Sequence, residues 1–234
     1  MNSSPAGADP IAQVFADAAH DLVGPINQVS SLMGLLLRKN PELSADPASA
    51  EILGHIQQAV TRMRTLADGL RTISRLLSDP MVMQPLEAGP LISSVLLNLQ
   101  DRIAAANAEV SVAELPTITA DSSRLMWLFE ELIENALKFR GSAPAVIRIA
   151  AEPLGQDWLF SVRDRGPGFD PKVADHVFRI FRRLNPNAPP GSGVGLTICR
   201  QIIERHHGKM WIEPEPGRGT TVFFTLPPAP NGDE

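Results

Sequence analysis

The sequence predicts an α+β protein in which a long helical hairpin precedes a domain with helices layered on one face of a mixed β-sheet. Three observations support this fold class. In the first third of the chain, apolar residues recur at steps of three and four, as on one face of a helix. In the remainder, helical periods are mixed with short alternating runs that are typical of strands. Asp79 and Pro80 separate the two regions, because proline cannot continue a helix.

The first region is expected to form two long helices between residues 8 and 78, separated by a polar, proline-containing break at residues 40–47. A lone hairpin of this kind leaves apolar surface uncovered, so we expect a homodimer that closes a four-helix bundle. Periodicity alone also fits a coiled coil that only dimerises. The predicted seam consists of Phe15, Ala19, Leu22, Ile26, Val29, Met33 and Leu36, then Ile52, Ile56, Ala59 or Val60, Met63, Leu66, Leu70, Ile73 and Leu77.

The second region is expected to begin with a linker and a short edge strand, before a helix from about residue 90 to 107. The elements predicted after that helix are a strand around Ile118, a helix at 122–139, strands at 146–151 and 158–163, a loop, a helix at about 194–207, and strands at 209–213 and 220–226. The predicted domains are therefore residues 1–80 and 81–228, followed by a disordered tail at 229–234.

Composition disfavours several classes of function. The net charge of -5 provides no broad basic surface, so we expect no nucleic-acid partner. No run approaches the roughly 18 apolar residues that cross a bilayer, and the first ten residues lack the features of a signal peptide. The expected protein is cytoplasmic, with no membrane span. The single cysteine, Cys199, is expected to be a buried apolar residue of a helix.

Glu131, Asn135 and Lys138 form the first candidate site. They stand at i, i+4 and i+7 of the predicted helix and therefore share one face. A neutral amide oxygen and a cation on one face suit Mg²⁺ bound to a polyphosphate. A solvated helix face would carry similar residues.

A second candidate site combines two turns. Asp164, Gly166 and Gly168 follow a strand, where glycines allow a ligand to approach the backbone and the carboxylate can accept a hydrogen bond from an exocyclic amine such as that of adenine. Thr220, in the last hairpin, would place a hydroxyl near such a base. A tight turn with a surface Asp, and a threonine that simply favours a strand, remain the alternatives.

The third candidate is the run of glycines at residues 191, 193 and 195, which leads directly into a helix. Backbone N–H groups in this arrangement bind phosphate. The run matches neither the P-loop nor the Rossmann fingerprint. Residues 185–190 are expected to act as a mobile lid.

Taken in this order, the segments resemble the ATP-binding domain of sensor histidine kinases, a branch of the ATPase fold shared with gyrase, Hsp90 and MutL. The resemblance covers roughly residues 85–227 and implies ATP and Mg²⁺ as cofactors. By this resemblance Asn135 matches the Mg²⁺-binding residue of the N box, Lys138 its phosphate-facing residue, Asp164, Gly166 and Gly168 the adenine-reading G1 box, Phe178 and Phe181 the F box of phytochrome-type kinases, and Gly193 and Gly195 the G2 box.

Residues 15–26 in turn resemble the H box of the dimerisation and phosphoacceptor domain, with His20 as the phosphoacceptor and Asp21 as the acid that orients it. Independently of the resemblance, His20 stands one position off the seam and is expected to face water. A neutral imidazole is a competent nucleophile near pH 7. We expect no role for His55, His176, His206 or His207, the last two standing at a helix end where cations are favourable.

The function implied is an autophosphorylating protein histidine kinase of a two-component system, which donates its phosphoryl group to an aspartate on a response-regulator receiver domain. Two alternatives stay open: a catalytically silent phosphotransfer or scaffold dimer, and an ATP hydrolase that uses Glu131, where kinases often carry Asn. Gly24 stands where kinases that dephosphorylate their partner often carry Thr, Asn or Gln, so we expect weak phosphatase activity. The sequence leaves open the signal, the response regulator, the choice between cis and trans phosphorylation, and whether a separate sensor protein is a partner.

Overall fold

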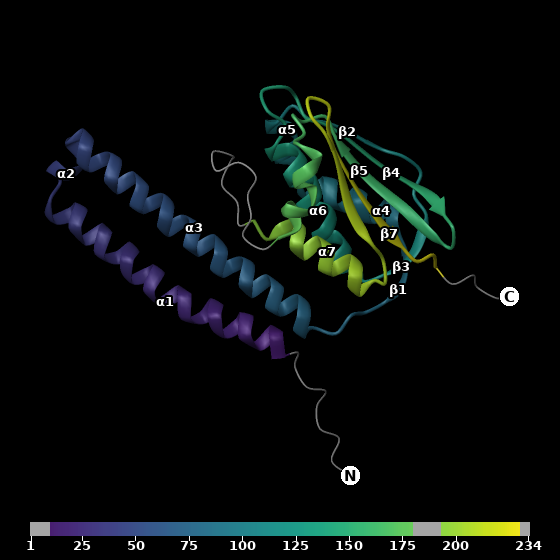
Figure 1. The fold of residues 1–234 in the computed structure, drawn as a ribbon, viewed down its shortest axis with the longest axis horizontal. Coiled ribbons are helices and arrows are strands. Elements are labelled where there is room, and N and C mark those ends of the chain that lie inside the picture. Colours follow the sequence, from purple (N-terminus) through teal and green to yellow (C-terminus); the bar gives the residue numbers. More distant parts are fainter. Residues whose placement is uncertain (1–9, 180–192, 230–234) are drawn as a thin grey trace, which may run out of the picture. The chain divides into compact units, whose positions relative to one another are not determined.

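The structure is a computed structural model that describes residues 10–179 and 193–229. The chain divides into two compact units at Asp79 and Pro80 (Figure 1). Among the described residues, no helix is both long and apolar enough to cross a membrane.

The first unit is the predicted helical hairpin. It consists of α1 (Pro10–Lys39), the short α2 (Glu42–Ala45) and α3 (Pro47–Ser78). Helix α3 begins where the Asp46 side chain accepts a hydrogen bond from the backbone N–H of Ser49 at 2.9 Å, with Pro47 in the first turn. It ends at Ser78, with Asp79 as its C-cap directly before Pro80, so the predicted break and stop are both confirmed.

Small and branched side chains make up the core of the hairpin, in which Ala19, Ile26, Val60 and Ala67 are buried. Outside this core, large apolar side chains remain 37–65% exposed on the hairpin taken alone. We call this set the exposed apolar face; it comprises Val14, Leu22, Val29, Leu32, Leu35, Leu36, Ile52, Ile56 and Met63.

The second unit contains the predicted mixed sheet. Its five strands run in the order β2-β4-β5-β7-β6, and only the β2–β4 pair is parallel. The strands are β2 (Glu109–Val112), β4 (Val146–Leu154), β5 (Asp157–Asp164), β6 (Met210–Glu215) and β7 (Gly219–Leu226), while β1 (Gln84–Glu87) pairs separately with β3 (Thr117–Ala120). Strand β2 was not predicted, because its four residues are mostly exposed and too few to give a clear alternating pattern.

The helices of this unit are α4 (Ala88–Asn98), α5 (Gln100–Ala105), α6 (Ser122–Lys138), the 3-10 helix η1 (Pro171–Phe178) and α7 (Gly195–Arg205). Helices α6 and α7 cover one face of the sheet (Figure 1). Between them and the strands, the rings of Phe129, Phe160 and Phe224 pack with centroids 5.3–6.2 Å apart.

Three details differ from the prediction. The single helix expected at residues 90–107 is two helices that meet at Leu99. The segment expected to be a loop after β5 contains η1. At the start of the predicted tail, the Ala229 N–H donates to the Thr117 carbonyl at 3.3 Å, and residues 230–234 lie outside the described residues.

Candidate functional site

The end of β5 meets the turn between β6 and β7. Asp164 pairs in register with Thr220, and its Oδ1 accepts backbone hydrogen bonds from Gly166 at 2.7 Å and from Thr220 at 3.2 Å. Burial raises the pKa of Asp164, while these two N–H donors oppose the rise. The two segments that the sequence separates by about 50 residues therefore form one cluster around a half-buried carboxylate.

Gly168 explains how closely these turns approach. Its φ is +59°, and a Cβ at this position would collide with the carbonyl oxygen of Glu215. Only glycine satisfies both conditions without strain. The Gly217 N–H adds a hydrogen bond of 2.7 Å to the Pro167 carbonyl, which holds the hairpin turn against the Asp164 segment.

Helix α6 carries the predicted acid, amide and cation. Asn135 Nδ2 donates to Glu131 Oε1 at 3.0 Å, one turn earlier on the helix. Burial raises the pKa of Glu131, the Asn135 bond opposes the rise, and Glu134 adds to it. The Lys138 ammonium lies 5.1 Å from the centroid of the Phe139 ring.

Gly195, the first residue of α7, lies against the Glu131 side chain, and a Cβ at position 195 would overlap the Glu131 carboxylate. The contact brings the end of the glycine run next to the polar face of α6. Gly193 has a φ of +67° two residues before α7. Gly191 and the predicted lid at 185–190 lie outside the described residues.

Phe178, at the end of η1, is buried, and its carbonyl accepts a hydrogen bond of 2.8 Å from the Thr197 hydroxyl in the first turn of α7. Arg200, also on α7, lies over the Phe178 ring at 5.1 Å. Sequence reasoning did not single out Thr197, because nothing local in the sequence relates it to a residue 19 positions earlier. Phe181 lies outside the described residues.

His20 and Asp21 belong to the other unit and are both exposed on α1. Ala19 is fully buried and His20 is not, as the heptad position required. One turn later, a Cβ added to Gly24 would meet nothing within 4 Å, so this part of the helix surface is open.

His206 corrects one expectation. It is completely buried, its Nε2 accepts a hydrogen bond from the Asp121 N–H at 2.9 Å, and its Nδ1 lies 2.7 Å from the Ile202 carbonyl. Burial lowers the pKa of His206, so the ring is neutral there. The expectation of a favourable cation at the helix end is therefore wrong for this residue.

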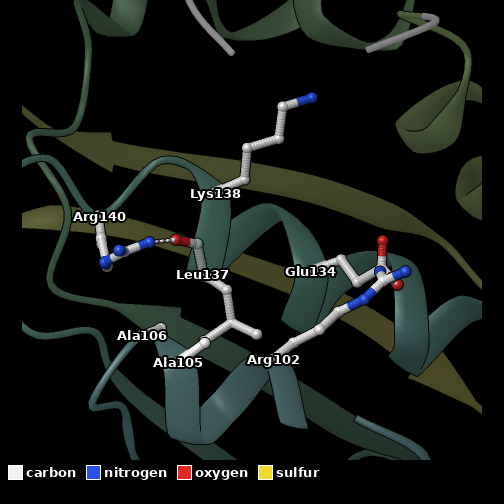
Figure 2. Close-up of a pocket in the computed structure, with 7 residues that line it drawn as sticks. All are labelled: Arg102, Ala105, Ala106, Glu134, Leu137, Lys138 and Arg140. Carbon is white, nitrogen blue, oxygen red and sulfur yellow. Dashed lines mark hydrogen bonds and ion pairs between the residues drawn. The ribbon is translucent and has the colours of Figure 1, made fainter. Parts of the chain in front are cut away.

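A cavity of about 350 Å³ lies beside the end of α6 (Figure 2), lined by Arg102, Ala105, Ala106, Glu134, Leu137, Lys138 and Arg140. Arg102 forms an ion pair with Glu134, and Arg140 donates to the Leu137 carbonyl at 2.7 Å. The Lys138 side chain points away from the other labelled residues (Figure 2). Arg140 thus satisfies one of the last carbonyls of α6, where the helix dipole also favours a cation.

Comparison with known proteins shows what these features resemble. Residues 120–230 match the family model described as histidine kinase-, DNA gyrase B-, and HSP90-like ATPase. The chain is 41% identical over 212 residues to cyanobacterial phytochrome A of Nostoc sp. The aligned region covers 90% of this chain and 28% of that protein. It thus spans about 28% of the length of this curated relative.

Solved structures show the same architecture. The catalytic domain of the histidine kinase ThkA is 27% identical and superposes with a TM-score of 0.56 over 64% of this chain and 97% of that one. Full-length ShkA, in complex with AMPPNP, superposes with a TM-score of 0.67 at 22% identity. The match covers 94% of this chain and 47% of that one. ThkA in complex with the response regulator protein TrrA superposes with a TM-score of 0.63 at 21% identity. The match covers 94% of this chain and 64% of that one. Residues 120–230 therefore match the histidine kinase-, DNA gyrase B- and HSP90-like ATPase model, and the chain shares its fold, a helical hairpin followed by this α/β unit, with solved histidine kinases.

Proposed function

We propose that residues 81–228 bind ATP with Mg²⁺ and that His20, in a dimerisation and phosphoacceptor hairpin at residues 1–80, takes the γ-phosphoryl group. The observation that carries the proposal is an exposed His20, within a segment like the H box, on the same chain as an ATPase domain of this family. A phosphoacceptor must be reachable, and a neutral imidazole is nucleophilic near pH 7.

In this proposal the nucleotide is held by groups from β5, β7, α6 and the start of α7. Asp164, at the end of β5, accepts a hydrogen bond from the exocyclic amine of adenine. Gly166, Gly168 and Thr220 surround this carboxylate. Lys138 and the backbone at Gly193 and Gly195 face the phosphates. The Asn135 side chain offers a hard oxygen that suits Mg²⁺, whose remaining ligands are typically phosphates and water.

His20 attacks the γ-phosphorus with a ring nitrogen. A P–N bond forms, the bond from phosphorus to the bridging oxygen breaks, and ADP leaves. Asp21 accepts the proton from the other ring nitrogen as positive charge develops on the imidazole. Catalysis here is mainly positioning and charge stabilisation.

The phosphoryl group then passes to an aspartate carboxylate of a response-regulator receiver domain. The ThkA–TrrA complex supports a partner of this kind, because its kinase shares the fold of this chain. The exposed apolar face of the hairpin supports a homodimer, in which a second copy covers these side chains.

Gly24 supports weak phosphatase activity toward that partner. A side chain one turn after His20 can orient a water molecule, and glycine has none. Rapid dephosphorylation of a receiver domain by the purified protein would contradict this.

The test is to incubate the protein with Mg²⁺ and ATP labelled on the γ-phosphate, and to treat the labelled band with acid and with base. We expect acid-labile, base-stable label on the wild type and none on His20→Gln. His55→Gln is the matched control, since His55 is an exposed histidine on the same hairpin, and it should label normally.

Each other outcome points elsewhere. Equal label on His20→Gln would exclude His20 as the acceptor. Phosphate release without label, unaffected by His20→Gln, would favour the ATP hydrolase. Absence of both label and nucleotide binding would favour the scaffold dimer.

A further inference from the structure

We propose that Glu131 is a positioning residue: its carboxylate holds the Asn135 amide so that Asn135 Oδ1 faces the metal of the bound nucleotide. The inference rests on the proposed function, in which Asn135 is a ligand of Mg²⁺. It assigns Glu131 a role different from that of a water-activating base.

The hydrogen bond between the two side chains can have only one donor and one acceptor. Asn135 Nδ2 donates to Glu131 Oε1 at 3.0 Å, and an ionised carboxylate can only accept. The two ends of an amide have nearly the same shape, so an isolated Asn can turn either end toward a ligand. Next to Glu131 the NH₂ end is held against the carboxylate, and the oxygen is directed the other way.

The carboxylate also lies against the first residue of α7. The Glu131 side chain occupies the space that a Cβ at residue 195 would need. Gly195 is not among the residues with positive φ, so glycine here leaves room for the carboxylate and does not relieve backbone strain. A carboxylate is also favourable near the N-terminus of α7, because the first backbone N–H groups of a helix have no acceptor within that helix.

This arrangement argues against Glu131 as a free base. Its Oε1 already accepts a hydrogen bond from the Asn135 amide, and the half-buried side chain lies against the first residue of α7. A base that activates water must reach that water. A positioning role needs only that the carboxylate stay where it is.

The experiment measures binding of the non-hydrolysable analogue AMPPNP as a function of Mg²⁺ concentration. We expect Glu131→Ala to raise the Mg²⁺ concentration for half-maximal binding by about tenfold, because the orienting hydrogen bond to a charged group is lost. Glu131→Gln should raise it less, since one orientation of the Gln amide still accepts from Asn135. The control is Glu134→Ala, which removes a carboxylate from the same helix without touching this bond, and it should match the wild type.

Repeating the measurement in an Asn135→Asp variant separates the effect of amide orientation from the effect of charge. A carboxylate presents oxygen at both ends, so an Asp at position 135 needs no orienting partner. In Asn135→Asp, Glu131→Ala should therefore lower the Mg²⁺ requirement by relieving repulsion, which reverses the sign of its effect.

A wild-type Mg²⁺ requirement in Glu131→Ala, equal shifts in the Glu131 and Glu134 variants, or the same sign in both backgrounds would overturn the proposal. If Glu131→Ala fails to fold, as judged by its melting temperature, the Gln variant carries the same test. Failure of the wild type to bind AMPPNP at any Mg²⁺ concentration would instead overturn the proposed function, and this inference with it.

Discussion

At the scale of the residue, the buried His206 connects three parts of the second unit. It contacts Asp121 at the start of α6 and Ile202 on α7, while Asp121 Oδ2 accepts the N–H of Val82 at 3.0 Å. Burial opposes ionisation of Asp121, but the donors Val82, Ser123 and Arg124 outweigh it, so the pKa of Asp121 lies below its usual value. A neutral imidazole is the only form that can accept from the Asp121 N–H.

Stability should therefore depend on the protonation of His206. Burial lowers the pKa of His206; the Ile202 carbonyl and Asp121 oppose this, and Arg124 and His207 add to it. Because the unfolded chain binds this proton more readily, the free energy of unfolding should fall as pH drops below about 6.5, by at most about 1.4 kcal/mol per pH unit.

Urea unfolding at pH 7.5, 6.5 and 5.5, followed by tryptophan fluorescence, measures how the free energy of unfolding depends on pH. His206→Gln should be less stable at pH 7.5 and show a flatter pH dependence. His55→Gln, which removes an exposed histidine from the other unit, should keep the wild-type slope. A slope unchanged in His206→Gln would show that another group titrates.

At the scale of the element, the contact between the Asp164 segment and the β6–β7 turn depends on a glycine with no room for a side chain. Gly168→Ala combines a left-handed φ with a collision against the Glu215 carbonyl. We expect it to destabilise the domain by about 3 kcal/mol or more and to weaken nucleotide binding, because the backbone must move.

Gly155→Ala is its matched control. Gly155 also has a positive φ, of +64°, but a Cβ there meets nothing within 4 Å. It should cost only about 1–2 kcal/mol, which is the cost of the left-handed conformation. Thermal unfolding of the two variants compares their losses of stability. Equal losses would mean that the close approach at Gly168 adds nothing to the cost of the substitution.

At the scale of the whole molecule, the exposed apolar face predicts the oligomeric state. Ile52→Glu places a charge at a side chain that is 61% exposed on the hairpin alone. If a second copy covers it, the dimer dissociation constant should rise by about a hundredfold or more, since burial of an isoleucine contributes about 1.5–3 kcal/mol in each copy.

Sedimentation equilibrium would report a mass near twice 25.3 kDa for the wild type and a shift toward one chain for Ile52→Glu. Gln28→Glu, a polar exposed position on α1, should leave the dimer intact. A monomeric wild type at micromolar concentration would contradict the dimer.

Elements with a strong local signal could be predicted from the sequence. The hairpin, α6, α7 and strands β4 to β7 each carry a clear apolar period, and Asp79 with Pro80 marks a stop that proline chemistry dictates. Strand β2 and the 3-10 helix η1 are too short for such a period to be recognised. Their positions depend on neighbours that are remote in sequence, such as the pairing of Glu109 with Val146.

The sequence by itself determined the order of the elements with a strong apolar period, the exposure of His20 beside a buried Ala19, and the residue types of the candidate nucleotide site, because periodicity and spacing are local properties. Only the tertiary structure decided that Thr220 contacts Asp164, that Glu131 lies against Gly195, and that His206 is a buried neutral ring. Those contacts join residues on different elements, and the packing of helices on the sheet sets which of them meet.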